Sequence, residues 1–240
     1  FESALHDPVD PDEIVESLSG NGIAIIEDIL SKKNLERLLS LINELKTTPF
    51  DSPKNLLLQK VERKIFDDQK RERLVCDFQN INFEELDYLT RKISFMFYGR
   101  TLVPTKSLYI DTCFDIPESK IRGDNYLHVD RFLPNLKILY SPFTITENNA
   151  PFAYSLNSHK INSVYKNFIL SAKNFDETDQ GVESFLKKKS VITLKANSAI
   201  VAITNGFHGR TSFNKSGERV ILFHQFNRSF DKLSYLNIFS

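Results

Sequence analysis

The sequence predicts a mainly β protein with helices packed on its outside, and two observations support this. From about residue 101, short runs rich in β-branched and aromatic residues alternate with Pro, Gly and Asn, as they do in β-sandwiches and barrels. Residues 11–100 instead contain apolar side chains at helical spacing. We therefore expect one domain over residues 1–240, in which a helical part (about 11–100) packs on a β core (about 101–230).

The N-terminal part contains three predicted helices and one short strand. Residues 11–18 carry acidic side chains in their first turn, where they favour the helix dipole. Residues 23–26 form a short apolar run that follows Gly22, which indicates a buried strand. Residues 35–45 have apolar side chains at i, i+3, i+4 and i+7, so they predict an amphipathic helix. The third helix is expected over about residues 82–98.

The β core is predicted from six runs separated by turn residues. These runs are residues 107–114, 126–132, 136–140, 190–195, 199–203 and 219–226. A further helix is expected at about 161–173. We expect two charged runs, 70–73 and 187–189, to be solvated surface.

Composition argues against several classes of protein. Lys plus Arg and Asp plus Glu each number 31, so there is no basic excess of the kind that nucleic-acid binders show. No stretch approaches the roughly 18 consecutive apolar residues of a membrane span, and no signal peptide is visible. The only two cysteines, Cys76 and Cys113, form no CxxC pair. We expect a cytoplasmic protein that acts on a small molecule, with no nucleic-acid partner and an oligomeric state that the sequence leaves open.

Three residues form a candidate metal site. Iron(II) that binds both O2 and a cosubstrate needs a half-empty coordination sphere, which two imidazoles and one carboxylate provide. His128 and Asp130 have the i, i+2 spacing that places both side chains on one face of a strand. His208 lies 80 residues downstream (208 − 128), after the apolar run 199–203 and a turn.

Arg219 is the candidate ligand for a cosubstrate carboxylate. A chelating 2-oxo acid such as 2-oxoglutarate leaves its distal carboxylate pointing away from the metal, and a buried carboxylate needs a cation with forked donors. Arg219 opens the apolar run 220–223, and an Arg at the start of a core strand is unusual unless it is paired.

With these motifs in place, residues 12–228 resemble the phytanoyl-CoA dioxygenase-like family of iron(II)/2-oxoglutarate-dependent oxygenases. The motifs that carry the resemblance are the opening 22–26 and 35–45, the segment 147–152, the turn 156–160, His208-Gly209 and Arg219. This chain has Ala150 and Asn157 where the family usually has Gly at turns, and Arg210 where a small polar residue is common.

The resemblance implies a double-stranded β-helix (a jelly roll, cupin-like) that binds iron(II) and 2-oxoglutarate. The implied reaction consumes O2 and 2-oxoglutarate and yields succinate, CO2 and an oxidised product. Halogenases of this fold lack the metal-binding carboxylate, so Asp130 favours hydroxylation over halogenation.

Five further residues have open roles. Lys137 and Thr211 are candidate cosubstrate contacts, although Lys137 would equally suit a strand face open to solvent. Tyr109, Arg131 and Arg210 are candidate substrate contacts, with core packing as the alternative for Tyr109. Together the cations suit a small or medium-sized anionic metabolite.

Two other functions stay open at this point. The chain could be a metal-binding cupin-like protein without oxygenase activity, or an isomerase of that kind. Arg219 argues against a simple metal site, because such a site needs no buried Arg eleven residues after its last ligand (219 − 208). A third alternative is a degenerate family member that serves only as an interaction domain.

Overall fold

The computed structural model describes residues 11–47, 61–66, 71–114, 127–130, 135–160 and 189–226. The helices within these ranges are α1 (Pro11–Asn21), α2 (Lys32–Thr47) and α3 (Glu84–Tyr98). The strands are β1 (Ile23–Ile26), β2 (Val61–Phe66), β3 (Arg71–Asp77), β4 (Thr105–Cys113), β5 (Leu136–Ser141), β6 (Phe152–Ser155), β7 (Lys189–Ile192), β8 (Ser198–Ile203), β9 (His208–Arg210) and β10 (Gly217–Gln225). None of the helices in the described part of the chain has the length and hydropathy that crossing a membrane requires.

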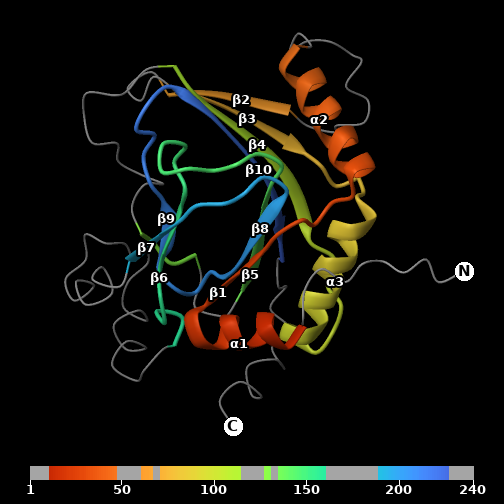
Figure 1. Ribbon diagram of the computed structural model, residues 1–240, viewed down its shortest axis with the longest axis vertical. Coiled ribbons are helices and arrows are strands. Elements are labelled where there is room, and N and C mark those ends of the chain that lie inside the picture. The colour runs from red at the N-terminus through yellow and green to blue at the C-terminus, as the bar shows by residue number, and fades with distance from the viewer. Residues whose placement is uncertain are drawn as a thin grey trace, which may run out of the picture.

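The strands form two antiparallel sheets. The large sheet has the order β1-β8-β5-β10-β4-β3-β2, and the small sheet has the order β7-β6-β9. Figure 1 shows the small sheet on one side of the large sheet and helices α2 and α3 on the other. The large sheet is therefore covered on both faces, which explains why its central strands are almost wholly buried.

Alternation along the strands divides the core into two layers. On β10, Val220 and Leu222 pack in the cluster that contains the helices, whereas Ile221 belongs to the cluster between the two sheets. The second cluster also contains Phe152 and Tyr154 from the small sheet. Residues of β10 that lie an even number of positions from Ile221 therefore point into the space between the sheets, where the candidate site lies.

Most predicted elements are confirmed, but the N-terminal part is not purely helical. Strands β2 and β3 form a hairpin that extends the large sheet, and strands β6 and β9 were not predicted either. The expectation that residues 70–73 are solvated surface is wrong in part, because Arg71 is only 3% exposed. Around His128, the described residues 127–130 form one isolated bridge rather than a strand. The helix expected at about 161–173 lies outside the described residues.

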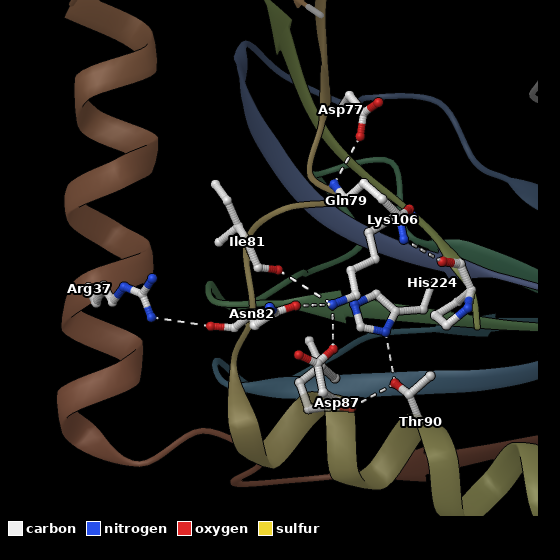
Figure 2. A network of polar contacts seen from close by, with 11 residues as sticks. Arg37, Asp77, Gln79, Ile81, Asn82, Asp87, Thr90, Lys106 and His224 are labelled. Atoms are coloured by element: carbon white, nitrogen blue, oxygen red, sulfur yellow. Dashed lines mark hydrogen bonds and ion pairs between the residues drawn. The ribbon is translucent and has the colours of Figure 1, made fainter. Parts of the chain in front are cut away.

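A buried polar network joins α3 to the outer face of the large sheet (Figure 2). Lys106 on β4 lies 2.6 Å from an Asp87 carboxylate oxygen on α3 and donates to Asn82 Oδ1 at 2.8 Å. His224 on β10 is in register with Lys106 and lies 2.8 Å from the Thr90 hydroxyl. Because Thr90 donates its own proton to Leu86 O, His224 Nδ1 is the donor in this pair. The network thus attaches α3 to the large sheet through an ion pair, Lys106–Asp87, and a neutral hydrogen bond, His224–Thr90.

Burial, with the nearby Lys106 charge, lowers the pKa of His224 to about 3. An unfolded His takes up a proton near pH 6.5, whereas the folded one resists protonation down to about pH 3. The free energy of unfolding should therefore fall as the pH drops from about 6.5 towards 3, by on the order of 3 kcal/mol at pH 4 from this group. Denaturant unfolding at several pH values should show a shallower fall for His224→Gln than for the wild type. Equal slopes would show that His224 does not keep its low pKa.

Candidate metal centre

The three residues of the candidate metal site come together between the two sheets. One ligand atom from each of His128, Asp130 and His208 lies within 4.8 Å of the other two. The Nε2 atoms of His128 and His208 lie 3.5 Å from the two different carboxylate oxygens of Asp130. Two imidazoles and a carboxylate thus converge on one point, as the spacing in the sequence predicted.

Backbone hydrogen bonds hold the two histidines side by side. His128 N donates to His208 O at 2.8 Å, and His208 N donates to His128 O at 2.9 Å. The two rings are 4.7 Å apart between centroids. Asp130 N donates to Thr204 O at 3.2 Å. Asp130 is therefore also tied to the segment that leads to His208. The strand expected around His128 is replaced by this single antiparallel bridge.

A buried turn supports the backbone that precedes His208. Ser158 Oγ donates to Ser155 O at 2.6 Å and accepts from Phe207 N at 2.7 Å. Gly206 has no room for a side chain, because a Cβ there would clash with the Tyr154 hydroxyl. The Ser-His-Lys turn that contributed to the family resemblance therefore supports the metal site structurally.

The hydrogen bonding of His208 leaves its Nε2 atom ready to bind a cation. Its Nδ1 lies 2.9 Å from Gly206 O, and since a carbonyl can only accept, Nδ1 carries the proton. Burial lowers the pKa of His208, which keeps the ring neutral. Nε2 is buried and has no hydrogen-bond partner among the described residues. A lone pair that faces a carboxylate in this way fits a metal ion between them.

Lys137 brings a cation to the same carboxylate. Its Nζ lies 2.5 Å from Asp130 Oδ2, and its side chain is 17% exposed. Burial alone would raise the pKa of Asp130, but His128 and the Lys137 ammonium hold it below its ordinary value. Lys137 therefore faces the site, and the alternative of a strand face open to solvent is wrong.

The two histidines line a cavity of about 290 Å³ between the sheets. This volume is near the lower end of ligand pockets, which run from about 300 to 1,000 Å³. Aromatic and aliphatic side chains from both sheets form part of the wall, namely Leu139, Phe152 and Phe223. The polar lining residues are Arg73, Thr105, Ser107, Tyr109, His128, Lys137, His208, Arg210, Arg219 and Gln225.

Arg219 lines this cavity and forms an ion pair with Asp111. An Arg at the start of a core strand was expected to need such a partner. Its Nη1 donates to Ala150 O at 2.8 Å, and its Nη2 donates to Asp111 Oδ2 at 3.2 Å. Asp111 is fully buried. Burial would raise the pKa of Asp111, but Arg219 and Arg73 hold it below its ordinary value. The charged Asp111 therefore fixes the Arg219 guanidinium at the cavity wall.

The other predicted site residues divide into three groups. Tyr109 and Arg210 line the cavity. Thr211 follows β9 and is not among the lining residues, and its backbone N donates to Pro151 O. Arg131 lies outside the described residues. Sequence reasoning missed Arg73, although the apolar residues 74–76 that follow it could have indicated a strand with Arg73 on one face.

Known proteins resemble this chain in structure but not in sequence. No family model matches the sequence, and no curated protein matches it. The epimerase SnoN in complex with Fe3+, alpha ketoglutarate and nogalamycin RO is similar over 90% of this chain and 82% of its own, at 9% identity and a TM-score of 0.58. HygX from Streptomyces hygroscopicus with nickel and 2-oxoglutarate bound is similar over 92% and 89%, at 15% identity and a TM-score of 0.53.

A third structure, EctD from S. alaskensis in its apoform, is similar over 94% of this chain and 79% of its own, at 11% identity and a TM-score of 0.59. These similarities, with the two facing antiparallel sheets, confirm the double-stranded β-helix or jelly-roll fold. The fold expected from the resemblance to the phytanoyl-CoA dioxygenase-like family is therefore the fold of this chain.

Two turn positions where the family usually has Gly have left-handed backbones here. Ala150 has φ of 51° and Asn157 has φ of 65°, a region that costs most side chains about 1–2 kcal/mol. Ala150 also supplies the carbonyl that Arg219 contacts. The turn at Ala150 thus helps to hold the Arg219 guanidinium in place.

Ala150→Gly and Ala153→Gly, in the buried strand β6, both lose a buried methyl group and gain the chain entropy of glycine. Because only Ala150→Gly also removes this strain, its free energy of unfolding should exceed that of Ala153→Gly by about 1–2 kcal/mol. Urea unfolding of both variants measures the difference. If Ala150→Gly destabilised the protein as much as Ala153→Gly, the left-handed backbone would not be a source of strain.

Proposed function

We propose that this protein is an iron(II)/2-oxoglutarate-dependent dioxygenase that hydroxylates a small or medium-sized anionic metabolite. One observation carries the proposal: two histidines of the His-Asp-His cluster and the fixed Arg219 guanidinium line the same cavity. Similar structures described as holding Fe3+ with alpha ketoglutarate, or nickel with 2-oxoglutarate, support it. In the balanced reaction, substrate C–H, O2 and 2-oxoglutarate give substrate C–OH, succinate and CO2.

In this proposal His128, Asp130 and His208 hold the iron. Such a facial set leaves three coordination positions for a bidentate cosubstrate and O2. When bound, the metal would supply the oxygen chemistry, while the protein supplies the ligands and orients the reactants. The neutral Nε2 of His208 and the ionised Asp130 are the forms that bind a metal without first losing a proton.

Arg219 is assigned to the distal carboxylate of 2-oxoglutarate. Its side chain is 7% exposed, and its guanidinium is held by Asp111 and Ala150 O, so little side-chain entropy remains to be lost on binding. Lys137 is a further cation of the cavity and is assigned to the cosubstrate or to an anionic substrate. Tyr109 and Arg210 are assigned to the substrate.

Hydroxylation must be tested against other reactions that this fold supports. The similar protein SnoN is described as an epimerase, so this fold supports an outcome other than hydroxylation. Asp130 argues against halogenation, because it occupies the position that halogenases of this fold leave open. Succinate release accompanied by a product that is heavier by one oxygen would support hydroxylation, whereas a product of unchanged mass would support isomerisation.

The first test is the visible charge-transfer band of an iron(II)–2-oxoglutarate chelate, recorded without oxygen. We expect the wild type to show the band and His208→Ala to lose it, because the variant has lost one of three metal ligands. His224→Gln, on the opposite face of the large sheet, is the control and should keep the band. A wild type without any band would rule out the oxygenase proposal.

The second test separates cosubstrate binding from metal binding. Arg219→Gln should weaken 2-oxoglutarate binding roughly 10- to 100-fold, since a hydrogen bond to a charged group contributes about 1.5–3 kcal/mol. Iron(II) affinity should stay within about threefold, because Arg219 is not a ligand. Calorimetric titrations of both ligands measure this, with the exposed Arg91→Gln as control. Equal losses of iron and 2-oxoglutarate affinity would point to a structural role for Arg219.

A further inference from the structure

Arg73 on β3 is a second guanidinium held at the wall of the same cavity. It is in register with Asp111 on β4. Its Nε and Nη2 donate to the two Asp111 oxygens at 2.7 and 3.4 Å. Its guanidinium carbon also lies 5.4 Å from the centre of the Tyr109 ring. Two neighbouring side chains of β4 therefore fix the position of this cation.

Asp111 holds guanidiniums from both neighbouring strands. Arg219 donates to it at 3.2 Å, Arg73 at 2.7 Å, and Arg71 Nε lies 4.0 Å away. The register places Arg73, Asp111 and Arg219 in one row across the sheet. Such a row is suited to bind anions at its edge on the cavity.

One anion does not account for both fixed guanidiniums at the cavity. The proposed function assigns Arg219 to the distal carboxylate of 2-oxoglutarate, and Arg73 lies on the other side of Asp111 in the row. Along β4, the cavity is lined by Thr105, Ser107 and Tyr109, three residues that carry hydroxyl groups. A polar ligand with one anionic end fits this wall better than an apolar one does.

We propose that Arg73, oriented by Asp111 and Tyr109, is an anion subsite that binds a carboxylate, phosphate or sulfate group of the primary substrate. This inference rests on the proposed function for the place of the substrate, but the subsite itself does not depend on iron. It identifies an anionic metabolite as the substrate class, and it identifies Arg73 as a specificity-determining residue.

The test is a calorimetric titration of inorganic phosphate, at constant ionic strength, into protein loaded with nickel(II) and 2-oxoglutarate. Nickel(II) prevents turnover, and 2-oxoglutarate occupies Arg219. We expect saturable binding of phosphate that weakens at least tenfold in Arg73→Gln. The exposed Arg91→Gln is the matched control and should bind like the wild type. A parallel titration with acetate distinguishes a preference for phosphate from a preference for carboxylate.

Three outcomes would overturn the subsite: neither anion binds the wild type, Arg73→Gln binds like the wild type, or Arg73→Gln loses affinity for 2-oxoglutarate instead. If Arg73→Gln does not fold, Arg73→Lys keeps the charge beside Asp111 but loses the forked donors, and it should weaken anion binding by about fivefold. Failure of the proposed function can be told apart from failure of the subsite. If 2-oxoglutarate did not bind, the proposed function would fail, but phosphate titrated into the metal-free protein would still measure the effect of Arg73→Gln on anion binding.

Discussion

The paired backbone hydrogen bonds between His128 and His208 are the interaction on which the candidate site depends. They join two segments that are 80 residues apart and place both imidazoles on one side of Asp130. The turn at Ser158 and the close approach of Tyr154 to Gly206 then hold the His208 segment in place. A metal site of three side chains requires such rigid support, because its ligand atoms must be placed within a few tenths of an ångström.

Asp111 has the corresponding role for the side of the cavity that we propose binds anions. A buried carboxylate is costly unless charged donors surround it, and here Arg73 and Arg219 approach it from the two neighbouring strands. The same interaction stabilises Asp111 and immobilises the two guanidiniums. Pre-organised cations bind an anion with less loss of side-chain entropy, so in the proposed function Asp111 would strengthen anion binding through the two arginines that it holds.

The large sheet separates two kinds of polar network. Between the sheets lie the candidate metal ligands and the cavity, whereas Lys106, Asp87 and His224 lie on the helix side (Figure 2). Alternation along β4 and β10 produces this division, because successive side chains point to opposite faces. Lys106 and Ser107 are adjacent in sequence, yet one binds α3 and the other lines the cavity. The outer network can therefore be changed without touching the proposed chemistry.

The sequence by itself determined the mainly β class, the three N-terminal helices and five core strands, since hydrophobic periodicity is a local pattern. It also indicated the three candidate metal ligands, because His128 and Asp130 lie two residues apart and His208 stands in a motif that resembles a known family. It did not reveal the β2–β3 hairpin, whose charged residues look like solvated surface until a buried partner is known. Only the tertiary structure decided that Arg73 and Arg219 share Asp111 and that Lys137 faces Asp130. Pairing between strands distant in the chain sets these contacts, and no local pattern records which strands become neighbours.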